Sequence, residues 1–396
     1  MKRITLKLLA FALGLFLICD VTGQEESTDD KVTFKYGGFV KADYLFTQYN
    51  NGAYSGAGRD FHIPGTTPYG NGNMHRYTDF HVKESRFNFD VSTTVNGKKL
   101  RSFLELDFML SGHGDERVSN SYNPRIRHFF LEYDKLLFGQ TWSTFMIVVI
   151  PDELDFLGAP EGLVFVRQPM VRLTVGDFQV SLENPYVTYT TVDPGTGLPV
   201  RNISETAILP ELIGRYNLKL SGGNLSFAAI ARQLEYTDGG NTSHNAIGLG
   251  VTAGGKLKIG SKDDIRFVGT IGSGLGRYVA LNFVNSSVMN NSADLEPIVT
   301  MNAYVAYLHH WTSKLRSSFS ASFVKANNNQ DLVGDLSNDM AMSISGNILY
   351  SPAKSLIFGV EPIYGYRELT DGTSGDFYRL QLSARYAFSF KTSVAK

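Results

Sequence analysis

Hydrophobic and polar residues alternate with a period of two along almost the whole chain. In residues 32–48 the even positions are mostly apolar, whereas Lys35, Lys41 and Asp43 are among the odd ones. Successive side chains of a β-strand point to opposite faces, so this pattern predicts a strand with one apolar and one polar face. Its length exceeds the roughly 5–6 residues that are typical of strands in soluble proteins.

The same alternation predicts sixteen strands. Their ranges are 32–48, 80–95, 99–111, 124–134, 135–145, 168–176, 177–190, 207–220, 224–236, 245–259, 264–277, 297–308, 313–327, 339–350, 355–368 and 376–390. Short turns such as Asn96-Gly97 alternate with long loops, which is the layout of outer-membrane barrels. Sixteen strands leave an aqueous channel, whereas eight would be filled by side chains. The predicted fold is therefore all-β, a transmembrane antiparallel β-barrel.

The first residues predict export. Lys2, Arg3 and Lys7 precede an apolar run over 8–18, and small or β-branched residues follow before Gln24. This is the pattern of a secretory signal peptide over residues 1–23. Its removal would take away three basic side chains and one acidic one, which changes the net charge from −1 to −3. It would also remove the only cysteine, Cys19, so disulfides, thiolate metal sites and cysteine nucleophiles are excluded.

Composition agrees with a membrane barrel. Charged residues make up 19% of the 396 residues, below the roughly 25% of soluble proteins. No apolar run of the mature chain approaches the ~20 residues of a spanning helix, so a closed barrel is the alternative that pairs every backbone group in lipid. The expected layout is a signal peptide over 1–23, an acidic segment over 24–31, a barrel over 32–390 and a short extension over 391–396.

Several short motifs resemble one family of bacterial porins. They are Gly139 to Phe145 (GQTWSTF), Leu154-Asp155-Phe156, Pro160-Glu161-Gly162, Arg167-Gln168-Pro169, Gly38 to Asp43 (GFVKAD) and Arg125-Ile126-Arg127. Over roughly residues 35–173 the chain resembles the DcaP-like family of outer-membrane porins. The resemblance implies a trimer of barrels, a narrowed lumen and uptake of small, often anionic, solutes. Some members carry a helical extension before the barrel, whereas residues 24–30 here are short and acidic.

Charged residues on the lumen parity are the candidate site. We expect the loop over 146–167, after the fifth strand, to fold into the lumen and to bring acids opposite a row of arginines. The alternation puts five arginines on the lumen parity: Arg86, Arg101, Arg172, Arg379 and Arg385. The resemblance implies that Arg125 and Arg127, which share one face, also point inward, and Arg167 lies where the loop returns to the wall. The acidic set is Glu84, Glu105, Asp107, Asp152, Glu153, Asp155 and Glu161. Arginine rings select anions in pores, so the set predicts a preference for small carboxylates. The alternative is a neutralised field that orients solutes without selecting their charge.

The predicted function is a porin for passive diffusion of small hydrophilic solutes. No catalytic residue, metal or cofactor is expected, since none of the eight histidines stands beside a serine elbow and His309-His310 would point to opposite faces. The expected partners are small solutes, outer-membrane lipids and two further copies of the chain, with no nucleic acid. The alternatives are a substrate-specific porin with another strand number, an adhesin, a surface enzyme or a soluble β-sandwich. The even strand count and the aromatic last strand, which ends at Phe390, speak against the sandwich.

Overall fold

The computed structural model describes residues 31–55, 58–110, 121–151, 154–237 and 242–395. The predicted signal peptide, residues 24–30 of the acidic segment, Asp152 and Glu153 lie outside the described residues. Within the described residues, no helix is long and apolar enough to span a membrane.

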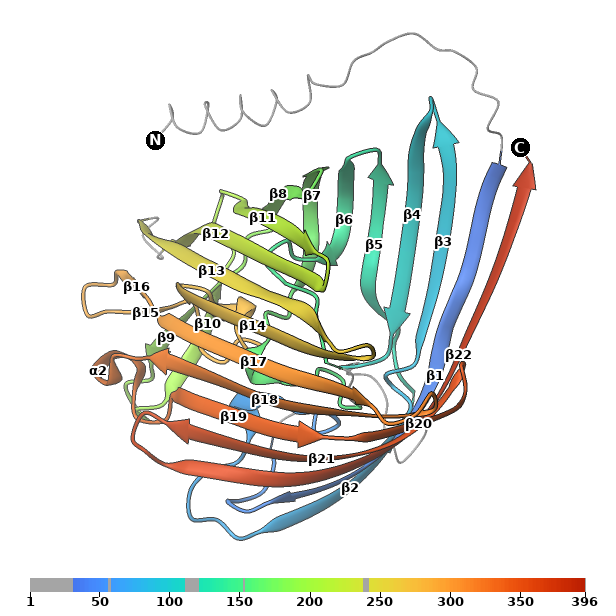
Figure 1. Cartoon of the computed structure of the whole chain (residues 1–396). Coiled ribbons are helices and arrows are strands. Elements are labelled where there is room, and N and C mark those ends of the chain that lie inside the picture. Colours follow the sequence, from blue (N-terminus) through green and yellow to red (C-terminus); the bar gives the residue numbers. More distant parts are fainter. Residues whose placement is uncertain (1–30, 56–57, 111–120, 152–153, 238–241, 396) are drawn as a thin grey trace.

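One antiparallel sheet closes on itself and forms the barrel (Figure 1). The first strand, β1 (Lys31–Tyr49), pairs along its whole length with the last strand, β22 (Ser374–Ala395), so that Val32 lies opposite Val394. The strands between them are β2 (His75–His81), β3 (Arg86–Val95), β4 (Lys98–Asp107), β5 (Arg125–Tyr133), β6 (Leu136–Trp142), β7 (Arg167–Val175), β8 (Phe178–Glu183), β11 (Glu211–Leu220), β12 (Gly223–Thr237), β13 (Ser243–Ile259), β14 (Asp263–Ser273), β17 (Val299–His310), β18 (Leu315–Asn327), β19 (Asn338–Gly346), β20 (Ile348–Ala353) and β21 (Leu356–Leu369).

Two strands of the wall consist of two pieces each. Both β2 and β3 pair with β1, and both β19 and β20 lie between β18 and β21. When each of these pairs counts as one strand, the barrel has the sixteen strands that the alternation predicts. The predicted strand over 80–95 is nevertheless interrupted at residues 82–85. There the Lys41 N–H donates to the Ser85 Oγ at 3.0 Å, so a side chain takes the place of a backbone acceptor.

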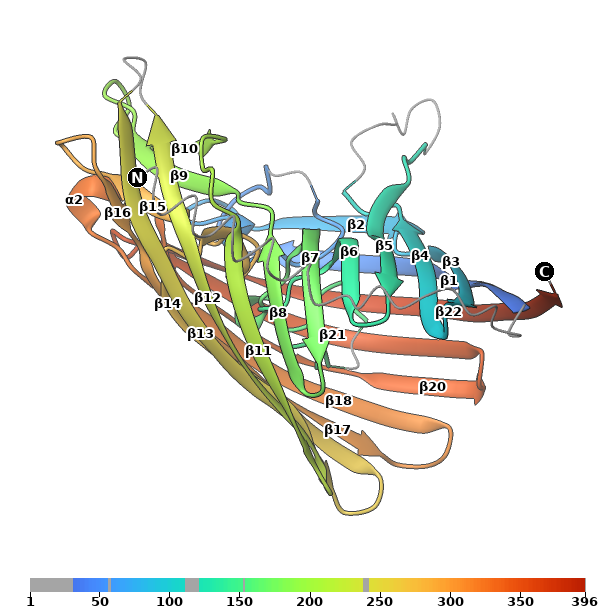
Figure 2. The same cartoon turned by 90° about the horizontal axis from the view of Figure 1, so that it is seen from above.

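A second, four-stranded sheet is formed by two of the long loops. It consists of β9 (Val187–Val192), β10 (Pro199–Ser204), β15 (Ser287–Met289) and β16 (Leu295–Pro297). These strands gather at one end of the molecule with the single-turn helix α2 (Gln330–Val333) (Figure 2). The predictions of one strand over 177–190 and of loops over 191–206 and 278–296 are therefore wrong in part. Pro185 ends the first run, because proline has no N–H for the ladder.

The two faces of the wall follow the predicted parity. In β22 Leu380 and Leu382 are 39% and 42% exposed, whereas Arg379 and Gln381 are buried. The apolar parity therefore faces outward and the polar parity inward, as predicted. The strand does not end at Phe390, because residues 391–395 continue the pairing with β1. The segment from 391, predicted as an extension, is thus part of the last strand.

Candidate functional site

A cavity of about 530 Å³ lies against the inner face of β3 to β6. On one side it is lined by the inward side chains of these strands. On the other side it is lined by Val148, Ile150, Pro151 and residues 155–158 of the segment between β6 and β7. Arg86, Arg101, Arg127 and Arg385 line it, together with Glu84, Glu105 and Asp155. Seven of the predicted site residues therefore meet at one cavity.

Strand register brings opposite charges together on this wall. Asp107 of β4 lies directly opposite Arg125 of β5, and its two carboxylate oxygens accept hydrogen bonds from Arg125 at 2.8 Å each. The register between β4 and β5 shifts next to Glu105, which leaves Arg127 as an extra residue on β5. A bulge of this kind re-aims a side chain. Arg127 is buried and donates to Glu105 at 2.7 Å and to Asp107 at 2.9 Å.

The arginines also stack on aromatic rings. The guanidinium of Arg385 lies 4.0 Å from the ring centre of Phe39. The guanidinium groups of Arg125 and Arg127 lie 5.5 and 5.7 Å from the ring centre of Phe156. A cation over a ring face is attracted by the ring quadrupole. Phe39 and Phe156 were not predicted as site residues. Phe39 departs from the apolar parity of its strand, which is the signal that could have found it, whereas Phe156 lies in a segment without periodicity.

Arg167 differs from the other arginines of this wall. Its guanidinium lies 4.6 Å from the ring centre of Trp142 and 5.3 Å from that of Phe165. Among the described residues no carboxylate forms an ion pair with it, and its buried Nη1 has no hydrogen-bond partner. Arg172 lies nearby and donates to the backbone carbonyl of Trp142 at 3.3 Å. Arg167 thus has no directly bound anion among the described residues.

The segment between β6 and β7 contacts inward side chains far away in the sequence. The backbone N–H groups of Leu154 and Asp155 both donate to the Glu361 carboxylate of β21, at 2.9 Å each. Arg379 of β22 donates to Asp155 at 3.3 Å. The carbonyl of Leu154 also accepts from Lys41, which pairs with Glu84. Lys41 and Glu361 were not predicted as site residues, although both lie on the polar parity of their strands.

Glu161 connects the same segment to the opposite wall. It lies on the short turn η2 (Pro160–Gly162) and contacts His62 Nε2 at 2.6 Å. The hydroxyls of Ser322 and Ser343 donate to its other oxygen at 2.5 Å each. Burial acts to raise the pKa of Glu161, but His62 and the two hydroxyls outweigh it, so the pKa is lowered. Glu161 is fully buried and bonds to the wall, and it does not line the cavity.

The predicted set therefore separates into groups. Arg125, Asp107, Arg167, Arg172 and Arg379 lie beside the cavity through their contacts with its lining residues, whereas Glu161 bonds to His62, Ser322 and Ser343 away from it. Asp152 and Glu153 lie outside the described residues. In the part of the chain that the structure describes, no group of three or more His, Cys, Asp or Glu is arranged to hold a metal ion.

Comparisons with known proteins agree on one architecture. The family model described as "DcaP outer membrane protein" matches residues 20–388. The solved outer membrane channel DcaP of Acinetobacter baumannii is similar with a TM-score of 0.75 and 23% identity, covering 93% of this chain and 100% of that one. An anion-selective porin from Comamonas acidovorans has a TM-score of 0.54 at 10% identity, with coverage of 90% and 100%. The trimer form of OmpT from Vibrio cholerae has a TM-score of 0.51 at 14% identity, with coverage of 90% and 99%. A search of curated proteins finds no match.

Proposed function

Because this chain belongs to the DcaP outer membrane protein family and is an outer-membrane porin, we propose that its channel favours small anions, in particular carboxylates. Its family and fold are those of a channel rather than of an enzyme. We also propose that it assembles as a homotrimer, as the Vibrio cholerae OmpT does in its trimer form. Small hydrophilic solutes and outer-membrane lipids are its proposed partners.

The observation that carries the anion preference is the excess of arginine over acceptor at the cavity wall. Arg125 and Arg127 both bond to Asp107, with Glu105 as a second acceptor for Arg127, and Arg167 has no carboxylate partner among the described residues. A guanidinium stays charged and binds a carboxylate in a fork, so an incoming carboxylate would find donors that the protein leaves unsatisfied. The rings of Trp142 and Phe165, at 4.6 and 5.3 Å, attract the Arg167 guanidinium and help to position it.

The contacts of residues 154–161 support a narrowed lumen. Glu361, Arg379 and Ser322 are inward side chains of three different strands, and all bond to this segment. A segment held to these strands as well as to the arginine wall would leave an eccentric passage beside β3 to β6. The insertion of the loop into the lumen stays a prediction, which these contacts favour.

One observation favours the neutralised alternative. Arg101 bonds to both oxygens of Asp90 at 3.0 and 3.1 Å, and Arg127 bonds to Glu105, so much of the positive charge already has a partner. In that case the field across the passage would orient dipolar solutes without excluding cations. The two functions differ in the sign and size of the reversal potential in a salt gradient.

The test is a planar-bilayer measurement of reversal potential in a KCl gradient. We expect anion preference for the wild type. Arg167→Gln removes a charge that has no carboxylate partner among the described residues. A unit charge about 4 Å from an ion is worth about 1 kcal/mol in water, or about fivefold in the anion-to-cation ratio. Arg201→Gln, an exposed arginine on β10, is the matched control and should leave the ratio unchanged. Cation preference in the wild type, or an unchanged ratio in Arg167→Gln, would overturn the proposal.

A further inference from the structure

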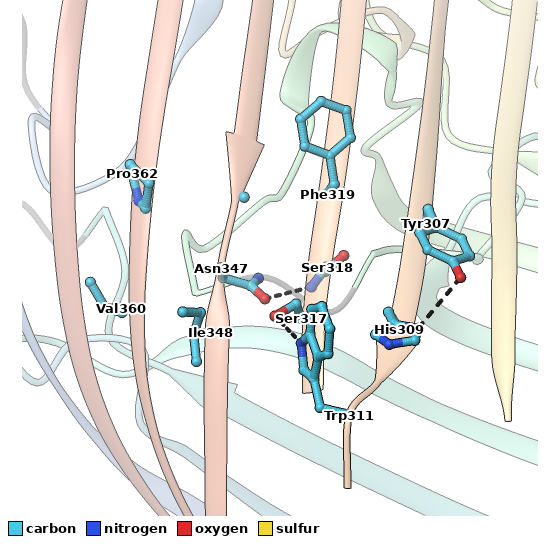
Figure 3. Close-up of a pocket in the computed structure, with 11 residues that line it drawn as sticks. Tyr307, His309, Trp311, Ser317, Ser318, Phe319, Asn347, Ile348, Val360 and Pro362 are labelled. Atoms are coloured by element: carbon cyan, nitrogen blue, oxygen red, sulfur yellow. Dashed lines mark hydrogen bonds between the residues drawn. The ribbon is translucent and has the colours of Figure 1, made fainter. Parts of the chain in front are cut away.

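A second cavity of about 630 Å³ lies on the outer face of the barrel, near the short turn between β17 and β18 (Figure 3). The side chains of Phe319, Ile348 and Pro362 line it, and Tyr307, His309 and Trp311 stand on one side. Phe319, Ile348 and Trp311 are 57%, 53% and 61% exposed, so this is an apolar surface without a protein cover in the monomer. Short turns of outer-membrane barrels lie on the periplasmic side.

The cavity exists because one row of the wall lacks an outward side chain. Gly346 ends β19 opposite Phe319 and presents no side chain to the lipid face. The next residue, Asn347, turns inward, where it accepts the Ser318 N–H at 2.7 Å and donates to Glu361 at 2.8 Å. A Cβ added at Gly346 would stand 3.7 Å from a Phe319 ring carbon and 3.9 Å from the Ser318 carbonyl oxygen, which is ordinary contact. The position therefore accepts a side chain but has none.

The edge of the cavity toward the short turns is amphipathic. Trp311 Nε1 donates to Ser317 Oγ at 2.9 Å, and Tyr307 and His309 both contact Asp263 at 2.8 Å. Aromatic residues with one polar group are typical of the membrane–water interface. Asp263 also accepts the His310 N–H at 3.0 Å, so the one carboxylate at this edge already has three partners.

Cations without partners lie at the same edge. Lys314 is in the turn between Trp311 and Ser317, and Lys262 directly precedes Asp263. Neither forms an ion pair among the described residues. Other lysines share this position. Every lysine of the described ranges that forms no ion pair lies at or near the short-turn end of the barrel. They are Lys31, Lys35, Lys99, Lys135, Lys258, Lys262, Lys314, Lys354 and Lys391. Paired lysines occur at both ends: Lys98 and Lys219 at short turns bond to Asp134 and Asp177, and Lys83 and Lys325 near the long loops bond to Asp60 and Asp339.

We propose that this outer cavity binds an anionic phospholipid of the periplasmic leaflet. An acyl chain occupies the apolar space beside Phe319 and Ile348, and the phosphodiester meets Lys262 and Lys314. The charges favour this occupant, since Lys262 and Lys314 form no ion pair within the described ranges and basic groups near a membrane surface attract acidic headgroups. The site lies on the lipid face and is separate from the arginine wall of the lumen.

The two tryptophans of the chain allow a direct test. Trp142 belongs to the lumen wall, so a lipid carrying a brominated acyl chain can quench Trp311 at this cavity while Trp142 gives a constant background. The protein is reconstituted in two samples of phosphatidylethanolamine vesicles. Both contain the same fraction of a brominated lipid, which is phosphatidylglycerol in one sample and phosphatidylethanolamine in the other. We expect stronger quenching by phosphatidylglycerol. Each lysine should raise the affinity for phosphatidylglycerol, relative to phosphatidylethanolamine, about fivefold.

Three variants make the test specific. Lys262→Gln with Lys314→Gln should abolish the headgroup preference, and Lys99→Gln with Lys135→Gln, at distant short turns, should preserve it. Gly346→Leu should fill the cavity and reduce quenching by both lipids, with unchanged conductance because the residue faces outward. Equal quenching by both lipids in the wild type would mean ordinary annular lipid and would overturn the proposal. Absence of quenching by either lipid would mean that another copy of the chain covers the cavity, which would also overturn it.

Discussion

Two walls of the barrel face the same lumen with different chemistry. The inward positions of β4 and β5 carry arginines and carboxylates, whereas those of β18 and β19 carry hydroxyls. The hydroxyl wall consists of Ser318, Ser320, Ser322, Ser343 and Ser345, all of them buried. The charged wall borders the 530 Å³ cavity, and the hydroxyl wall is in contact with the segment between β6 and β7.

The difference shows how side-chain size decides where the passage lies. Ser320 bonds to Ser345 at 2.8 Å and Ser322 to Ser343 at 3.1 Å, so small hydroxyls satisfy one another close to the sheet. Backbone also approaches closely next to this wall: a Cβ on Gly162 would stand 2.5 Å from the Ala303 carbonyl carbon of β17, the strand that pairs with β18. Arginine side chains cannot lie so close to the sheet, because the carboxylates and aromatic rings that they contact also need space. The open space therefore lies beside the long charged side chains.

The largest expected effect breaks the charged wall. Asp107→Ala would remove the shared acceptor of Arg125 and Arg127, and breaking a buried ion pair from one side costs about 3–5 kcal/mol. Ser320→Ala in the hydroxyl wall should cost about 1 kcal/mol, the usual net worth of a neutral hydrogen bond. Urea unfolding in lipid vesicles measures both. Equal losses of unfolding free energy would mean that the two walls do not differ in the way their contacts indicate.

The outer face of the barrel contacts lipid all round, so it should not show this difference between walls. There the cost of adding a charge should depend on its depth in the membrane. Leu382→Arg would place a charge on the lipid face of β22 and should cost about 2–4 kcal/mol if it lies at the midplane. Phe390→Arg, eight residues further toward the strand end, should cost only about 0–1 kcal/mol. Folded yield from heat-modifiable gel migration, together with unfolding free energy, reports the two costs. If both arginines were tolerated equally, the outward parity would be wrong.

The smallest expected effect concerns pH and the hydroxyl wall. The pKa of Glu161 is lowered in the folded protein, so its contribution to stability is complete above the usual value of 4.5 and is lost as pH falls through the lowered pKa. Glu161→Gln should therefore show a shallower loss of unfolding free energy below pH 4.5 than the wild type. Glu296→Gln, an exposed residue of β16, serves as the control and should follow the wild type. A Glu161→Gln profile parallel to that of the wild type would contradict the role of this carboxylate.

The alternation of residues predicts the walls well, because inward and outward positions follow from the period of a strand. It places Arg101 and Glu105 on the inner face, where the structure has them, whereas the inward placement of Arg127 comes from the family resemblance. It does not predict that Arg127 sits at a bulge, because a register shift depends on the neighbouring strand. The contact between His62 and Glu161 joins two loop segments 99 residues apart, and nothing periodic marks either one. The same reason hides the second sheet, whose strands are short and pair only with one another.

The bonds of Glu361 have a consequence for the order in which the barrel is completed. This carboxylate, near the C-terminus, accepts the N–H groups of residues 206 and 207 positions earlier, and Arg379 reaches Asp155 across 224 positions. Contacts of such long sequence separation form late, because loop-closure entropy must be overcome first. Until β21 and β22 have been added, Leu154 and Asp155 lack these acceptors. Closure of the wall by its last two strands and docking of the segment between β6 and β7 should therefore be one late event, so a barrel that has not closed would also have no finished passage.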